Sequence, residues 1–211
     1  MSGFPVAEEG LDPAFTALTD GLARAAAGQE RPVFIAMLGV PGAGKSSLTA
    51  ALELCMPDLA CVSFDRLMAA LPDYQILAQE DKAAAFARYE LPARMAGYRL
   101  LRLLLAKRAN LVFDHGGADR RHPELLRFAK AQGYLVAVAA FSTPPDEARR
   151  RIAARAGRHT PLAYVDERAR LLADLRADYR ALADWWHEAR GPDYTAEAET
   201  LRRTIRGAPP G

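Results

Sequence analysis

The segment from Gly39 to Ser46, GVPGAGKS, constrains this chain more than any other, because it fits the pattern GxxxxGK[ST] in full. It follows a short apolar run at 33–38 and opens a stretch with helical periodicity at 45–55. In that context, glycines let successive N–H groups point at one phosphate chain, and the helix N-terminus adds a positive dipole end. The sequence therefore predicts a nucleotide site in a phosphate loop (Walker A).

Two residues of this loop have distinct expected roles. Lys45 should reach the terminal phosphates, and the hydroxyl of Ser46 should bind Mg²⁺. The expected ligands are therefore ATP, with GTP as the alternative, and Mg²⁺. The residues expected to bind the nucleotide are Gly39, Pro41, Gly42, Ala43, Gly44, Lys45, Ser46 and Ser47.

Short apolar runs alternate with helical patterns along the chain, which predicts a parallel sheet with helices on both faces. Strands are expected at 33–38, 59–64, 110–113 and 134–141. Helices are expected at 11–27, 45–55, 81–108, 123–132, 145–156, 164–188 and 196–206. Pro92 should kink or split its helix, Trp185 and Trp186 fall in the helix 164–188, and no fifth strand is evident. The expected fold class is α/β, a three-layer phosphate-loop NTPase fold with a mostly parallel sheet.

The composition is that of a globular chain and gives little support to a nucleic-acid partner. Lys and Arg number 28 and Asp and Glu 26, for a formal net charge of +2. No apolar run approaches the roughly 20 residues of a membrane span, and the N-terminus lacks the basic start and apolar core of a secretory signal. Cys55 and Cys61 form no CxxC pair. We expect a cytoplasmic protein with reduced thiols and no membrane contact.

Two carboxylates follow expected strands, and the carboxyl ends of parallel strands meet at the ligand-binding edge of such a sheet. Asp114 closes the run 110–113 and is expected to hold Mg²⁺; the alternative is a helix cap or turn residue. Asp65 closes the run 59–64 and is expected to accept the proton of an attacking hydroxyl. Its alternatives are a helix cap and a second Mg²⁺ ligand.

Arginines are dense between 145 and 159, and transferred phosphoryl groups need mobile positive charge around them. The segment 157–161 resembles a lid loop between two helices, which favours Arg155 and Arg168 as catalytic residues. Arg151 lies four residues before Arg155, on the same helix face, and is expected to bind the nucleotide. His159 is either a substrate contact in the lid or an ordinary loop residue.

With these motifs placed, the chain resembles the zeta-toxin-type kinases, within the broader group of small-molecule and polynucleotide kinases with a phosphate loop. The similarity runs from about Val33 to Leu172. Beside GVPGAGKS, the residues that match the family pattern are Asp65, Pro72, Tyr74, Arg151, Arg155, Gly157, Pro161 and Arg168. The resemblance implies a helical lid and a Mg²⁺–ATP phosphotransferase, with Asp65 as base and Arg155 and Arg168 as charge clamps.

The departures from the family pattern fall in the acceptor region. The family's arginine falls on Met68, its histidine falls on Leu71, and Gly116 lacks a hydroxyl. Characterised members phosphorylate UDP-N-acetylglucosamine and act as toxins held by an antitoxin. The resemblance therefore implies a small-molecule acceptor and an antitoxin-like protein partner. The side-chain groups that this chain lacks are ones that would hold a polar sugar nucleotide.

Three functions remain open at this stage. The leading one is a kinase for a hydroxyl of a small molecule or nucleotide sugar. A polynucleotide 5′-hydroxyl kinase is the second; nucleic acid is the less favoured acceptor, and the basic residues within 81–108 would have to form its track. The third is a nucleotide-binding regulatory module without catalysis. The expected organisation is an N-terminal helical extension at 1–30, a kinase domain at 31–190 with a lid at about 145–170, and a C-terminal helix with a disordered tail at 191–211.

Overall fold

A five-stranded sheet organises the chain, whose computed structural model describes residues 11–154 and 160–207. The strands are β1 (Val33–Leu38), β2 (Ala60–Val62), β3 (Leu111–Gly116), β4 (Leu135–Phe141) and β5 (Trp185–Ala189). Their order is β2-β3-β1-β4-β5, and every adjacent pair is parallel. The predicted α/β class with a parallel sheet is confirmed.

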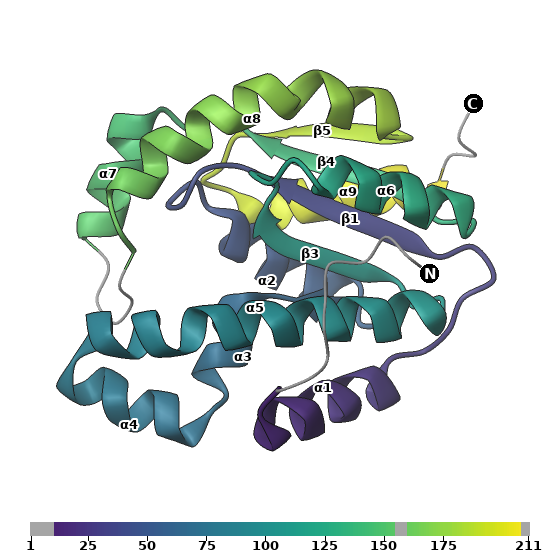
Figure 1. Cartoon of the computed structure of the whole chain (residues 1–211). Coiled ribbons are helices and arrows are strands. Elements are labelled where there is room, and N and C mark those ends of the chain that lie inside the picture. The colour runs from purple at the N-terminus through teal and green to yellow at the C-terminus, as the bar shows by residue number, and fades with distance from the viewer. Residues whose placement is uncertain (1–10, 155–159, 208–211) are drawn as a thin grey trace.

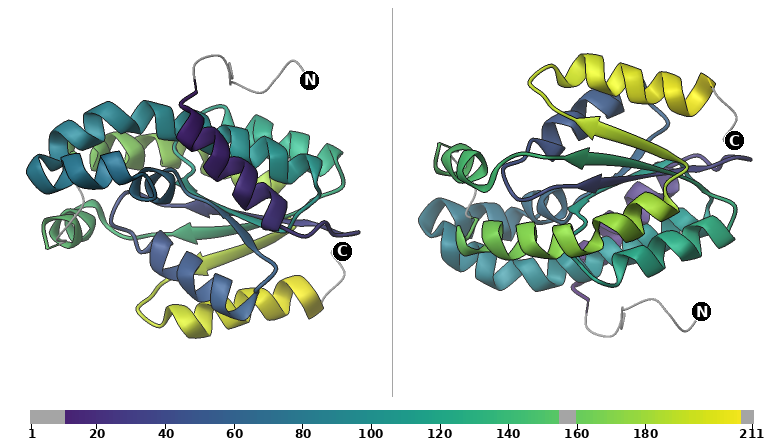
Figure 2. Two further views of the ribbon diagram at one scale, coloured as in Figure 1. Left: turned by 90° about the horizontal axis from the view of Figure 1, so that it is seen from below. Right: turned by 90° about the horizontal axis from the view of Figure 1, so that it is seen from above.

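Helices of the described residues cover both faces of the sheet. They are α1 (Pro13–Ala25), α2 (Lys45–Cys55), α3 (Phe64–Ala69), α4 (Pro72–Glu80), α5 (Lys82–Ala106), α6 (His122–Ala131), α7 (Pro145–Ala153), α8 (Ala163–Leu182) and α9 (Tyr194–Gly207). Helices α2 and α9 lie on one face, and α1, α5, α6 and α8 lie on the other (Figures 1 and 2). The chain therefore forms three layers.

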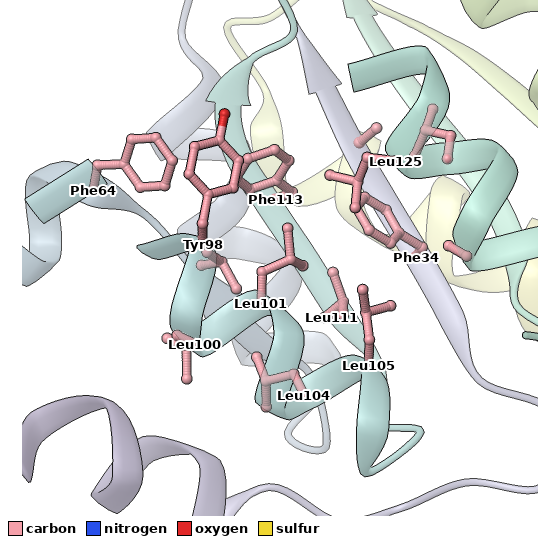
Figure 3. Close-up of a cluster of buried hydrophobic side chains, with 14 of the residues drawn as sticks. Phe34, Phe64, Tyr98, Leu100, Leu101, Leu104, Leu105, Leu111, Phe113 and Leu125 are labelled. Atoms are coloured by element: carbon pink, nitrogen blue, oxygen red, sulfur yellow. The ribbon is translucent and has the colours of Figure 1, made fainter. Parts of the chain in front are cut away.

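Alternating side chains of β1 join two separate cores, which is why all six of its residues are buried. Phe34 and its alternates pack toward α5, whereas Ile35 and its alternates pack toward α2 and α9. Figure 3 shows the first core, where leucines of α5 lie near Phe34 and Phe113. Burial of apolar surface on both faces fixes the central strand and so places the loop that follows it.

The sequence prediction was wrong about the end of the chain, because Trp185 and Trp186 lie in a fifth strand rather than in a helix. Helix α8 ends at Leu182. Two residues later, Asp184 accepts a 2.7 Å bond from the N–H of Val136 and pairs with Lys130 at 2.5 Å. These contacts anchor the turn to β4 and allow β5 to pair with β4. No Gly or Pro marks the change in the sequence.

Other boundaries also differ from expectation. Strand β2 stops at Val62 because α3 begins at Phe64, so Asp65 lies in the first turn of a helix instead of at a strand end. Strand β3 runs on to Gly116 and contains Asp114. Helix α5 is not split, since it continues through Pro92. Residues 66–80, for which no element was predicted, form most of α3 and all of α4.

Helix α1 is attached to α5 by basic side chains. Arg99 donates to Thr19 Oγ1 at 2.7 Å and to Asp20 Oδ1 at 2.8 Å, and Lys107 donates to two carbonyls at the end of α1. Arg108 donates to the carbonyls of residues 29, 30 and 132. These cations therefore join parts of the fold. The division of the chain into an extension, a kinase domain and a C-terminal part stays a prediction.

Candidate active site

The phosphate loop curls around the ammonium group of Lys45, whose Nζ donates to the carbonyls of Gly39 and Val40 at 2.9 Å each. Gly42 and Gly44 have φ of 82° and 106°, a region that favours glycine. A Cβ on Gly44 would also lie 2.0 Å from the hydroxyl of Tyr194, at the start of α9. Glycine is therefore required at 44 by both the backbone angle and the packing.

The first residues of α2 meet β3 across the loop. Ser46 Oγ donates to Asp114 Oδ2 at 2.9 Å, and Asp114 is only 6% exposed. A hydroxyl beside a carboxylate offers the oxygen ligands that Mg²⁺ prefers. Within the described ranges, no group of three or more His, Cys, Asp or Glu side chains could hold a metal by itself. This pair therefore fits an ion that takes its remaining ligands from phosphates and water.

Strand β3 carries an irregularity where the site lies. Ala36 of β1 faces Phe113, but Leu38 faces Gly116, so β3 has one extra residue in this stretch. Gly116 has φ of 91°, and a Cβ there would lie 2.8 Å from the carbonyl of Gly39, whose N–H donates to Gly116 O at 3.0 Å. The glycine at 116 thus lets the phosphate loop pack directly on the end of β3.

A single cavity joins the phosphate loop to the side chains expected to act on an acceptor. The loop contributes Gly39, Pro41, Gly42, Gly44, Lys45 and Ser46. Asp65 and Met68 of α3, Asp114 of β3 and Arg168 of α8 also line it. The structure therefore brings Lys45, Ser46, Asp65, Asp114 and Arg168 together, as a site for phosphoryl transfer would need.

The other residues predicted to bind the nucleotide, Ala43, Ser47 and Arg151, lie near this cavity but do not line it. Ala43 is buried, and its carbonyl accepts from Thr143 Oγ1 at 3.3 Å and from Arg151 Nη1 at 3.4 Å. The N–H of Ser47 donates to Gly44 O at 3.0 Å in the first turn of α2. Arg151 of α7 also pairs with Glu147. Arg151 is thus a neighbour of the loop, and its role with nucleotide stays a prediction.

The predicted catalytic arginines differ in what the structure records. Arg155 and His159 lie outside the described residues. Arg168 Nη1 donates to Ala118 O at 3.0 Å, and its guanidinium carbon lies 5.3 Å from the centre of the Tyr164 ring. These contacts hold the guanidinium at the cavity wall, which suits a group that stabilises charge on a transferred phosphoryl.

Sequence reasoning missed the wall that α5 contributes. Phe86, Glu90 and Arg94 lie on one side of this helix at spacings of four and line the cavity, and Glu90 forms an ion pair with Arg94. The spacing was visible in the sequence. Nothing local to it showed, however, that this face of α5 would lie opposite the phosphate loop.

His115, which lines the cavity, packs into a cluster of aromatic rings. The His115 ring stacks on Phe113 with centroids 5.5 Å apart and lies 4.7 Å from the ring of His122. His122 Nε2 is 2.9 Å from the hydroxyl of Tyr98. Burial lowers the pKa of His122 to about 4 and that of His115 well below its usual value. Both imidazoles are therefore neutral at pH 7.

Comparison with protein families gives a match to the Zeta toxin model over residues 18–178. Comparison with the curated proteins gives no match. The described helices include none long and apolar enough to cross a membrane.

Solved structures with a similar fold include several kinases. Beside these kinases, one similar structure is from a study of the PezAT chromosomal toxin-antitoxin system of Streptococcus pneumoniae, with a TM-score of 0.63, 16% identity, and 93% of this chain and 89% of that chain covered. The shikimate kinase of Acinetobacter baumannii has a TM-score of 0.55 and 19% identity, covering 83% of this chain and 94% of that one. The gluconokinase of Sinorhizobium meliloti 1021 has a TM-score of 0.50 and 21% identity, covering 83% of this chain and 95% of that one. These likenesses show a fold of the phosphate-loop kinase type.

Proposed function

This chain belongs to the zeta toxin family, and from that premise we propose that it is a kinase that transfers the γ-phosphoryl group of ATP to a hydroxyl of a small molecule. The observation that carries the proposal is the cavity in which the Ser46–Asp114 pair, Lys45 and Asp65 meet. Nucleotide phosphates, a metal ion and an acceptor hydroxyl all need to be within reach of one another for this reaction. GTP remains the alternative nucleotide.

Each of these side chains has a proposed task. The N–H groups of the loop bind the phosphates, and Lys45 balances their charge. Ser46 and Asp114 would hold Mg²⁺, which supplies charge neutralisation at the phosphate oxygens when it is bound. Asp65 accepts the proton of the attacking hydroxyl. Arg168 donates hydrogen bonds to the phosphoryl oxygens as charge develops on them, and Arg155 is proposed for the same task.

A polynucleotide acceptor is less well supported by α5 than its sequence suggested. The proposed basic track included Arg99, Lys107 and Arg108, but these cations bind α1 and the carbonyls of nearby loops. Of the basic residues of α5, Arg94 lines the cavity. We therefore favour a small acceptor. The antitoxin-like partner and the cytoplasmic location stay predictions. If no acceptor is phosphorylated, the alternative is a purely regulatory nucleotide-binding module.

The proposal is tested with ATP labelled at the γ-phosphate, Mg²⁺, and two acceptor sets: fractionated small metabolites and 5′-hydroxyl oligonucleotides. We expect label in the metabolite fraction with the wild-type protein, and little with Lys45→Ala. The matched control is Lys82→Ala, since Lys82 is exposed at the start of α5 and does not line the cavity. Normal transfer by Lys45→Ala would contradict the phosphate-loop mechanism.

A further inference from the structure

We propose that the acceptor is a free sugar or a similarly compact polyhydroxyl alcohol, and that Glu90, Arg94 and His115 position it. This inference rests on the proposed kinase function. It concerns the part of the cavity lined by α5, by α3 and by His115 of β3.

Two residues that line this part of the cavity each carry a buried nitrogen with no hydrogen-bond partner among the described residues. These nitrogens are Nε of Arg94 and Nδ1 of His115. Buried polar atoms in folded proteins are nearly always paired. Both residues line the same cavity, so a molecule that enters it is the natural source of the missing partners. A hydroxyl group suits both, because it donates and accepts.

The charges of this wall favour a neutral acceptor. Arg94 is the cation that α5 contributes to the cavity, and Glu90 already pairs with it. The other described acidic group on the acceptor side is Asp65. A diphosphate, as in a nucleotide sugar, would add negative charge beside two carboxylates and one neutralised guanidinium. A polyhydroxyl compound adds none, and its hydroxyls can donate to the Glu90 carboxylate while accepting from Arg94.

The apolar part of the lining completes the match. Phe64, Met68 and Phe86 line the same region, and the buried Phe64 ring lies 4.7 Å from the ring of His115. A sugar presents C–H groups as well as hydroxyls, so it can cover apolar side chains and satisfy polar ones in one site. Met68 stands where the resembling family carries an arginine, which removes a cation that an anionic acceptor would use.

The first test compares matched acceptors. Wild-type protein with Mg²⁺ and labelled ATP is given free monosaccharides and polyols, including N-acetylglucosamine, alongside UDP-N-acetylglucosamine and a 5′-hydroxyl oligonucleotide. We expect label on a free sugar or polyol. Label only on the nucleotide sugar or the oligonucleotide would overturn the inference and leave the kinase function intact, and so would turnover of ATP with no labelled compound in the panel. Failure to bind Mg²⁺–ATP in calorimetry would instead overturn the proposed function.

The second test asks whether these side chains position the acceptor. Arg94→Gln, Glu90→Gln and His115→Phe should each raise KM for the labelled acceptor at least about 10-fold, with KM for ATP within about 2-fold of wild type. The matched control is Arg88→Gln, because Arg88 is exposed on the same helix and does not line the cavity. The double variant Glu90→Gln with Arg94→Gln leaves no unpaired charge if a single variant fails to fold. An unchanged acceptor KM in the folded variants would overturn the assignment.

Discussion

Ser46 Oγ on α2 donates a 2.9 Å hydrogen bond to Asp114 Oδ2 on β3, although 68 positions separate the two residues in the chain. The contact exists because β1 and β3 are adjacent and parallel, so the loop after β1 reaches the end of β3. It places a neutral donor and a carboxylate at the point where α2 begins. We therefore expect the two oxygens to act as one unit toward a metal ion.

We expect Ser46→Ala and Asp114→Asn each to weaken Mg²⁺-dependent nucleotide binding by at least about 10-fold, the lower end of what losing a partner in a metal site costs. Because the two side chains share a hydrogen bond, the double variant should lose less than the sum of the single losses, with a coupling of about 0.5–3 kcal/mol. Calorimetric titration of ATP with and without Mg²⁺ measures the cycle. Strict additivity would show that the two groups act independently.

Asp65→Asn should abolish transfer and leave ATP binding in place. The amide keeps the size of the side chain but cannot accept a proton from the attacking hydroxyl. Asp65 lies in the first turn of α3 and lines the cavity, so the substitution leaves the cavity shape largely unchanged. Single-turnover transfer and calorimetry, each with and without Mg²⁺, give the two readouts. A clear drop in Mg²⁺-dependent affinity would favour a metal-ligand role, and full transfer would contradict both roles.

Arg168→Ala should lower kcat by about 30- to 1000-fold, which corresponds to about 2–4 kcal/mol of barrier, while KM for ATP changes little. An interaction made mainly as charge develops acts on the chemical step rather than on ground-state binding. The same result is expected for Arg155→Ala. The control is Arg170→Ala, since Arg170 is exposed on α8 and does not line the cavity. Weaker ATP binding at unchanged kcat would make Arg168 a ground-state phosphate ligand.

The free energy of unfolding should fall as the pH is lowered from about 6.5 to about 4, in part because of His122. Burial lowers the pKa of His122 to about 4 in the folded protein, from the ordinary histidine value of 6.5. Between these pH values the unfolded chain binds the proton and the folded chain does not, so acid favours unfolding. A shift of this size corresponds to roughly 3 kcal/mol.

Urea unfolding at a series of pH values, compared between wild type and His122→Asn, measures this contribution. The asparagine keeps a polar group near the Tyr98 hydroxyl but cannot titrate. The variant should be less stable at pH 7 and show a shallower loss of stability toward pH 4. An equal slope for the two proteins would show that His122 does not titrate in this range. His115, whose pKa is also lowered by burial, accounts for part of the remaining slope.

The geometry of the phosphate loop was predictable because its signal is local, and its role with nucleotide stays a prediction. The segment from Gly39 to Ser46 follows a strand, forms a loop and begins a helix. Its motif residues each meet a known requirement of the backbone or of phosphate binding, so the pattern can be recognised from the sequence alone. Asp114 was also predictable, since an acid that follows a run of buried apolar residues emerges at the edge where parallel strands meet. The structure corrects its position from the end of β3 to within it.

The acceptor half was not predictable to the same degree, because its contacts depend on tertiary packing. Glu90 and Arg94 resemble any exposed ion pair on a helix until α5 is placed against the sheet. Strand β5 was missed for a similar reason: the bonds of Asp184 that end α8 and start the strand reach back to β4 and to α6. Interactions that connect distant segments leave no periodic trace in the residues around them.

Consecutive residues of β3 face opposite layers of the molecule: Asp114 meets Ser46 of α2, whereas His115 meets Phe64 of α3. The sheet thereby separates the proposed metal-binding residue from the proposed acceptor-positioning residue, although a single peptide bond joins them. With the roles proposed above, a change at 115 would alter which alcohol is accepted while the carboxylate at 114, the proposed metal ligand, keeps its neighbours. Divergence of substrate choice at constant phosphate chemistry therefore needs no rearrangement of the backbone, only new side chains on one side of one strand and on the helices that cover it.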